Sequence, residues 1–175
     1  MKDSLLKIAI LGATGYVGLE LIKLLEKHPK TKITYLCAQR FIGKSVNSFD
    51  KKIKSKRLPN VSKVDKINWK NVDLVFSALP NGEAQKLALK IPKKIKIIDL
   101  SADFRLSSSL LYKKWYKINH NSKQLIKKSI YSIPEFNKKK IQKYNIIGNP
   151  GCYPTSIQIP LIPLLQKKMI NTKNI

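Results

Sequence analysis

The sequence predicts an α/β protein built on a doubly wound, mostly parallel sheet. Short apolar runs alternate with segments whose apolar residues recur at helical spacing, which is the pattern of successive βαβ units. A glycine-rich turn joins the first apolar run to the first helical segment. The length of 175 residues suits one well-cored domain.

The elements follow in order along the chain. Five short apolar runs are predicted to be strands, at residues 7–11, 33–37, 73–78, 95–100 and 145–148. Apolar residues at helical spacing predict helices at residues 16–27, 83–90 and 154–165. The polar, lysine-rich stretch 39–71 favours no assignment, and we find no internal repeat.

Positive charge dominates the composition. Lysine and arginine number 35 against 10 acidic residues, for a formal net charge of +25, which makes nucleic acid a candidate partner. Arginine, however, occurs only at positions 40, 57 and 105, and the lysines are scattered without interleaved aromatic residues. Because base recognition depends on arginine and stacking on aromatic rings, we expect no specific nucleic-acid partner. A salt-dependent, non-specific affinity for polyanions is still expected.

Other partners and compartments are constrained by simple counts. No apolar run approaches the roughly 20 residues that span a bilayer, so no membrane association is expected. The two cysteines are far apart and no secretory leader precedes the first strand, which indicates a cytoplasmic protein without a disulfide framework. No metal site is expected.

The turn after the first predicted strand has the pattern GxxGxxG. It comprises Gly12, Ala13, Thr14, Gly15, Tyr16, Val17 and Gly18. Glycine permits a tight turn and a close backbone approach to a pyrophosphate, whose charge is received by N–H groups at the helix N-terminus. The motif predicts a Rossmann-type dinucleotide site. The alternative is a tight turn that needs glycine only for packing.

The end of the second predicted strand bears on the choice of cofactor. NAD sites usually place an Asp or Glu about 20 residues past the glycines, to bind the ribose 2′-hydroxyl. Residues 37–40 contain no acid there, whereas Arg40 and Lys44 could face a 2′-phosphate. We therefore expect NADP(H), although in so basic a chain Lys44 could equally be an ordinary surface lysine.

Five motifs together carry a resemblance to a known family. They are GATGYVGLEL near the start, LPNG at 79–82, DLSADFRL at 99–106, YSIPE at 131–135 and NPGCYPT at 149–155. In their order and spacing they resemble the N-terminal half of the N-acetyl-gamma-glutamyl-phosphate reductases, relatives of the aspartate-semialdehyde dehydrogenases. The resemblance covers essentially the whole chain and adds Leu79 and Pro80 to the implied cofactor site. Two departures are Asn81, where the family usually has histidine, and Ser132, where it has glycine.

The resemblance implies a reductase of arginine biosynthesis. Such an enzyme uses NADPH and a cysteine thioester to reduce the acyl phosphate N-acetyl-gamma-glutamyl phosphate to N-acetylglutamate 5-semialdehyde, releasing phosphate. Cys152 is the implied nucleophile, and it lies at the N-terminus of the helix predicted at 154–165, whose dipole favours the reactive thiolate. Cys37 lies within an apolar strand and is expected in the core.

Three further residues are candidates for binding the small-molecule acyl-phosphate substrate. Arg105 offers a fixed cation to the phosphate in a chain where arginine is scarce. Its alternative role is an ion pair with Asp103 or Asp99 that shapes the loop. Asn149 and Glu135 are weaker candidates for positioning the substrate.

The general base of the implied mechanism is not found in this chain. The family carries that histidine in a second domain for substrate binding and dimerisation, whereas only His28 and His120 occur here and neither matches its motif. We therefore divide the chain into a cofactor domain at 1–150 and, at 151–175, the cysteine helix with the start of a truncated second domain. We expect the longer enzyme to be a homo-oligomer, and this chain alone to be inactive.

Three other readings remain open. A related reductase acting on an aspartyl or aminoadipyl phosphate would share the glycines and the cysteine. An extended short-chain dehydrogenase or sugar epimerase would need a tyrosine four residues before a lysine, and no tyrosine here has that partner. A basic nucleic-acid-binding module would show salt-dependent binding to random duplex DNA.

Overall fold

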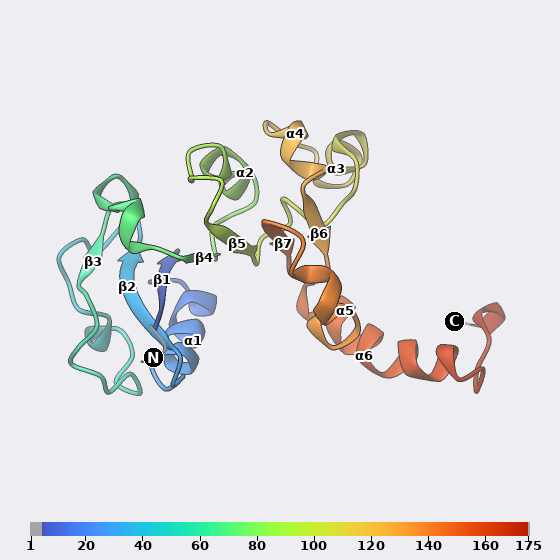
Figure 1. The fold of residues 1–175 in the computed structure, drawn as a ribbon, viewed down its shortest axis with the longest axis horizontal. Coiled ribbons are helices and arrows are strands. Elements are labelled where there is room, and N and C mark those ends of the chain that lie inside the picture. The colour runs from blue at the N-terminus through green and yellow to red at the C-terminus, as the bar shows by residue number, and fades with distance from the viewer. Residues whose placement is uncertain (1–4, 175) are drawn as a thin grey trace.

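The computed structural model describes residues 5–174, which form one seven-stranded sheet with helices on both faces (Figure 1). All strand pairs are parallel, and the order across the sheet is β3-β2-β1-β4-β5-β7-β6. The strands are β1 (Leu6–Leu11), β2 (Thr31–Cys37), β3 (Val61–Ser62), β4 (Leu74–Ser77), β5 (Lys96–Asp99), β6 (Ser129–Tyr131) and β7 (Ile146–Gly148). The predicted α/β fold with a Rossmann-type parallel sheet is confirmed.

The helices alternate with these strands. They are α1 (Tyr16–Leu25), α2 (Glu83–Ala88), α3 (Ser109–Tyr116), α4 (Lys123–Ile126), α5 (Pro134–Ile141) and α6 (Cys152–Gln166). Four short 3₁₀ turns are η1 (Val46–Ser48), η2 (Val64–Lys66), η3 (Trp69–Asn71) and η4 (Thr172–Asn174). Figure 1 shows α2, α3 and α4 on one face of the sheet, with α1 and α5 on the other.

The core is divided by the sheet into two apolar layers. Side chains of β1 alternate between them, because successive residues of a strand point to opposite faces. Ile8 and Ile10 pack with Ile22 of α1, whereas Ala9 and Leu11 pack with the layer beneath α2. All four of these strand residues are fully buried. This two-sided burial explains why β1 reads as a continuous apolar run rather than an alternating one.

Every strand and helix predicted from the sequence is present, with ends that shift by up to two residues. Helix α6 begins at Cys152, two residues earlier than expected. The unassigned stretch 39–71 contributes the two-residue edge strand β3 and three 3₁₀ turns. The sequence analysis missed β6, α3, α4 and α5, which together connect β5 to β7.

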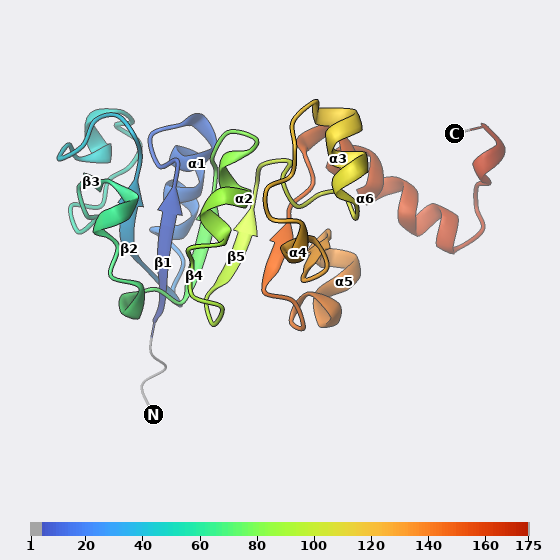
Figure 2. The ribbon, with the colours of Figure 1, turned by 90° about the horizontal axis from the view of Figure 1, so that it is seen from above.

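Helix α6 is the longest helix within residues 5–174, yet none of its 15 residues is buried. Tyr153 is 80% exposed and Ile157 is 55% exposed, although the helix is largely apolar. Figures 1 and 2 both show α6 running outward from the sheet, with its C-terminal end far from the other elements. Within residues 5–174, no helix combines the length and apolar character that crossing a membrane would need.

Candidate functional site

A cleft of about 900 Å³ opens at the carboxyl edge of the sheet. The strand order reverses between β1 and β4, and ligands of open α/β sheets bind in the crevice that such a reversal creates. The cleft is lined by turns that follow β1, β2 and β4, by η2 and by one side of α2. The lining comprises Gly12, Thr14, Gly15, Cys37, Ala38, Gln39, Arg40, Phe41, Lys63, Val64, Asp65, Leu79, Pro80, Glu83, Lys86, Leu87 and Lys90.

The glycine turn lines this cleft, and its backbone packs closely against the neighbouring chain. Gly12 has φ +82°, and a Cβ there would stand 2.3 Å from the carbonyl oxygen of Ala78. The N–H groups of Gly12 and Ala13 both donate to the carbonyl oxygen of Cys37, at 2.8 and 3.0 Å. These bonds fix the turn against β2. Helix α1 then begins after Gly15, so its N-terminus is at the cleft.

The other residues of the motif have different places. Ala13 and Gly18 are buried beneath the turn. Tyr16 is 81% exposed and Val17 is 45% exposed, and neither belongs to the cleft lining.

Charged side chains in the cleft are mainly cationic. Lys86 is paired with Glu83 at 2.8 Å, whereas Arg40 and Lys63 form no ion pair within residues 5–174. Lys44 lies outside the cleft lining, and its Nζ stands 5.9 Å from the centroid of the Phe41 ring.

The unassigned segment supplies two charged cleft residues that the sequence analysis did not identify. Lys63 is the N-cap residue of η2, directly after β3, and Asp65 lies within η2. The motif spacing gave no signal for either, because both follow a long polar connection after β2. Asp65 brings an acid into the cleft from outside residues 37–40, where the sequence analysis looked for one and found none.

Beyond the cleft, the loop after β5 meets the chain after β7. The guanidinium of half-buried Arg105 donates from Nε to the carbonyl oxygen of Asn149 and from Nη2 to that of Leu100, each at 2.9 Å. The main-chain N–H of Asn149 in turn donates to the carbonyl oxygen of Asp99, at 2.8 Å. The alternative ion pair of Arg105 with Asp99 or Asp103 is not formed.

Cys152 is the first residue of α6, directly after the N-cap Gly151, and it is exposed. Arg105 lies next to this turn, since a Cβ on Gly151 would stand 3.1 Å from its Nη1. The first-turn N–H groups of a helix have no intrahelical partner, so the thiol begins a helix whose free donors favour an anion. A cation and a helix N-terminus thus meet beside an accessible thiol.

Cys37 has the opposite environment. It is fully buried at the end of β2, and burial raises the pKa of its thiol above the ordinary value. Its expected place in the core is therefore confirmed.

Glu135 and the two departures from the family pattern, Asn81 and Ser132, lie outside the cleft lining. Glu135 is exposed in the first turn of α5. Asn81 is exposed, and its Oδ1 accepts a hydrogen bond from the main-chain N–H of Ala102, at 3.1 Å. Ser132 is buried, and its N–H donates to the carbonyl oxygen of Gly148, at 3.2 Å. Both departures from the family pattern are thus accommodated by main-chain contacts.

Neither histidine is placed as a general base. His120 is 2% exposed, its Nε2 lies 2.8 Å from the carbonyl oxygen of Asp103, and its Nδ1 accepts from the N–H of Ser122 at 3.3 Å. Burial lowers the pKa of this imidazole. His28 lies three residues past the end of α1, where its Nδ1 accepts from the N–H of Lys30. Both rings are therefore engaged by main chain.

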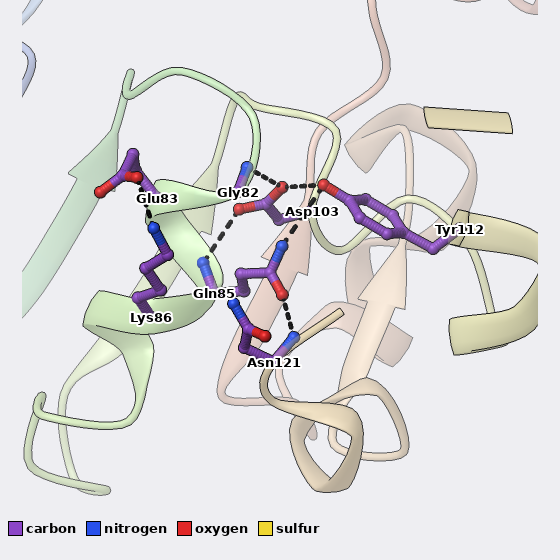
Figure 3. A network of polar contacts seen from close by, with 7 residues as sticks. All are labelled: Gly82, Glu83, Gln85, Lys86, Asp103, Tyr112 and Asn121. Atoms are coloured by element: carbon purple, nitrogen blue, oxygen red, sulfur yellow. Dashed lines mark hydrogen bonds and ion pairs between the residues drawn. The ribbon is translucent and has the colours of Figure 1, made fainter. Parts of the chain in front are cut away.

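A buried polar network links the loop after β4 and the start of α2 to the loop after β5 (Figure 3). The carboxylate of Asp103 accepts hydrogen bonds from the N–H groups of Gly82 and Gln85 at 2.7 and 2.9 Å, and from the hydroxyl of Tyr112 at 2.5 Å. Gln85 also bonds to Tyr112, and its Oε1 accepts from the N–H of Asn121. Burial and the Asp103 contact raise the pKa of Tyr112 far above its ordinary value. The sequence analysis considered Asp103 only as a partner of Arg105.

The chain is similar to two sequenced reductases along nearly its whole length. It is 44% identical over 169 residues to the N-acetyl-gamma-glutamyl-phosphate reductase of Ehrlichia canis, covering 96% of this chain and 49% of that protein. It is 43% identical over 172 residues to the enzyme of the same name from Clostridium botulinum, covering 98% of this chain and 50% of that protein. The chain spans about half the length of the relatives it matches, from 41% to 51%.

Solved structures share the fold. The aspartate semialdehyde dehydrogenase II of Vibrio cholerae superposes with a TM-score of 0.68 at 22% identity, over 94% of this chain and 43% of that one. The aspartate semialdehyde dehydrogenase of Candida albicans, solved with NADP, superposes with a TM-score of 0.65 at 22% identity, over 93% and 47% of the two chains.

A family model gives the assignment. The model described as "Semialdehyde dehydrogenase, NAD binding domain" matches residues 7–144, which include every element from β1 to α5 except the first residue of β1. The cleft and its glycine turn lie within the matched range. The chain therefore belongs to the semialdehyde dehydrogenase NAD-binding domain family.

Proposed function

We propose that this chain is the cofactor-binding, cysteine-bearing part of a reductase that converts N-acetyl-gamma-glutamyl phosphate to N-acetylglutamate 5-semialdehyde and phosphate, with NADPH, in arginine biosynthesis. The observation that carries the proposal is an exposed Cys152 at the first residue of α6, beside Arg105. It lies on the carboxyl edge of the same parallel sheet as the cleft. The names of the sequence relatives support the acyl phosphate as substrate.

The cleft fits a dinucleotide phosphate. Only a residue without Cβ can occupy position 12, because any side chain there would overlap the backbone of Ala78. Without side chains at the glycines, a pyrophosphate can approach the backbone of the turn closely. The N-terminus of α1 points its free N–H groups at that place. We assign Gly12, Thr14 and Gly15 to the phosphates, and Leu79 and Pro80 to the opposite wall.

We assign selectivity for NADPH to Arg40 together with Lys63, which takes the place expected for Lys44. Both line the cleft and neither forms an ion pair within residues 5–174, so their charges are free for a 2′-phosphate. Asp65 is the competing signal, since an acid there could instead bind a ribose hydroxyl.

Acyl transfer uses the chain's own groups. The Cys152 thiolate attacks the acyl carbon, a C–S bond forms, the bond to the phosphate oxygen breaks, and phosphate leaves with the electron pair. Arg105 is already oriented by the carbonyl oxygens of Asn149 and Leu100, so Nη1 remains to face the phosphate. Asn149 acts by holding Arg105, and we assign Glu135 a weaker positioning role. NADPH, when bound, supplies the hydride that turns the thioester into an aldehyde and frees the thiolate.

The division of the chain at residue 150 is also a proposal. Helix α6 buries none of its residues against the sheet, which supports the assignment of 151–175 to a second unit of the longer enzyme. The exposed apolar residues of α6 further support assembly into a homo-oligomer. Free thiols stay reduced in the cytosol, so we propose a cytoplasmic location.

Calorimetric titration of the chain with NADPH and with NADH tests the cofactor assignment. Wild type should prefer NADPH, and Arg40→Ala should lose about tenfold or more in NADPH affinity, because a hydrogen bond to a charged group contributes roughly 1.5–3 kcal/mol. The matched control is Arg57→Ala, since Arg57 lines a separate hollow with Lys7 and Lys32. Equal affinity for the two cofactors would contradict the 2′-phosphate assignment, and a preference for NADH would point to Asp65.

A further inference from the structure

Two loops build the site, and they follow neighbouring strands. The loop after β4 carries Leu79 and Pro80 into the wall of the cleft and leads through Gly82 into α2. The loop after β5 carries Arg105 to the turn that precedes Cys152. In the proposed function a cofactor touches the first loop and an acyl phosphate the second, so a contact between the loops would link the two halves of the site.

Asp103 makes that contact. Its side chain belongs to the second loop, but its two oxygens accept from the N–H groups of Gly82 and Gln85, at the start of α2 (Figure 3). Its third partner, the hydroxyl of Tyr112, comes from α3 and does not join the two loops. Figure 3 shows the carboxylate enclosed among these three donors.

The contact is costly to break because it is buried and hydrogen-bonded. Asp103, Gln85 and Tyr112 are each 0% exposed. Within residues 5–174 Asp103 forms no ion pair, and the partners of its side-chain oxygens are the two N–H groups and the hydroxyl. Separating the loops would leave a buried carboxylate and two buried N–H groups without partners.

A second hydrogen bond also joins the two loops. Oδ1 of Asn81, in the first loop, accepts from the N–H of Ala102, the residue before Asp103, at 3.1 Å. The carbonyl oxygen of Asp103 is itself held by His120. The segment that leads to Arg105 is therefore fixed to the cofactor side of the site at adjacent residues.

We propose that Asp103 is a positioning residue that couples the cofactor cleft to Arg105 and, through it, to Cys152. This proposal rests on the proposed function, because it takes the cleft as the NADPH site and Cys152 as the nucleophile. Asp103 does not touch the reacting atoms. It fixes the position of Leu79 and Pro80, in the wall of the cleft, relative to Arg105. Cofactor binding at that wall is therefore linked to the arrangement of Arg105 beside the cysteine.

The test compares Asp103→Asn with Tyr112→Phe in the 175-residue chain. In Asp103→Asn an NH₂ group replaces one oxygen and faces the N–H of either Gly82 or Gln85, so one hydrogen bond between the loops is lost. Tyr112→Phe removes a buried bond to the same carboxylate but leaves both bonds between the loops intact. The two readouts are NADPH affinity by calorimetry and the rate at which iodoacetamide alkylates Cys152, measured by peptide mapping.

In Asp103→Asn we expect NADPH affinity to fall about tenfold, the factor that one charge-assisted hydrogen bond contributes, and alkylation of Cys152 to slow as Arg105 shifts. Tyr112→Phe should lose stability yet keep both values within about twofold of wild type. Asn81→Ala, at an exposed position, weakens the same pair of loops with less risk to folding and should move both readouts in the same direction.

Wild-type values for either readout in both Asp103→Asn and Asn81→Ala would overturn the coupling, as would equal effects of Tyr112→Phe. A wild-type chain that binds no NADPH would instead contradict the proposed function. The alkylation rates of the three variants would then still decide whether Asp103 positions Arg105.

Discussion

The stability of this protein should decrease between pH 4 and pH 7 through the titration of Asp99. This carboxyl is fully buried at the end of β5, and burial raises its pKa to about 6 despite hydrogen bonds from the N–H and hydroxyl of Ser101. An unfolded chain would ionise the same group near pH 3.9. The difference of about 2 pH units corresponds to about 3 kcal/mol at about 1.36 kcal/mol per unit.

The sign follows from which state binds the proton more tightly. The folded state does, so the group stabilises the fold fully below about pH 4, and this contribution is lost as the pH rises through 6. Asp99→Asn keeps an oxygen that can accept from Ser101 but cannot ionise. Relative to wild type, the variant should therefore gain about 3 kcal/mol between pH 4 and pH 7.

Urea unfolding of wild type and Asp99→Asn at pH 4, 5, 6 and 7 measures this difference. Burial lowers the pKa of His120, which makes both proteins less stable at low pH, but that contribution cancels when the variant is compared with wild type. A difference between the two free energies of unfolding that stays constant across this range would refute the reasoning.

The remaining predictions concern the cysteines and the end of β7. Iodoacetamide at neutral pH should label Cys152 much faster than Cys37, because the first is exposed and the second fully buried, and faster labelling of Cys37 in the folded chain would contradict the site. Gly148→Ala should destabilise the chain by about 3 kcal/mol, because the added Cβ would stand 2.2 Å from the main-chain oxygen of Phe104. Gly43→Ala, with φ +80° but no neighbour within 4 Å, should cost only about 1–2 kcal/mol, and equal urea midpoints for the two variants would show that backbone contact at β7 is not limiting.

Much of the fold was predictable because its central strands are buried on both faces. β1, β2 and β4 contribute to both apolar layers and read as apolar runs, and the chain had few other ways to bury them. The missed elements lack that signal. β6 has only three residues, and α3 buries only Tyr112 while Leu110 and Trp115 stay 79% and 69% exposed. A helix that packs through one side chain leaves little periodicity in the sequence.

The site was predictable only where motif and position coincide. The glycine turn and Cys152 could be found because a turn and a helix N-terminus have local sequence signatures. Lys63 and Asp65 reach the cleft only through the pairing of β3 with β2, which no local pattern encodes. The same holds for Asp103, whose partners lie 18 and 21 residues away across two loops.

Mass spectrometry of the chain after brief exposure to N-acetyl-gamma-glutamyl phosphate tests the central claim most directly. We expect release of phosphate, a single hydroxylamine-sensitive acyl adduct that maps to Cys152, and no adduct of this kind in Cys152→Ser. Sustained turnover should be absent, because the buried His120 and main-chain-bound His28 offer no general base, whose loss typically removes a factor of about 10² to 10⁴. A thioester on Cys37, no cysteine adduct, or steady NADPH-dependent turnover by this chain would contradict the account.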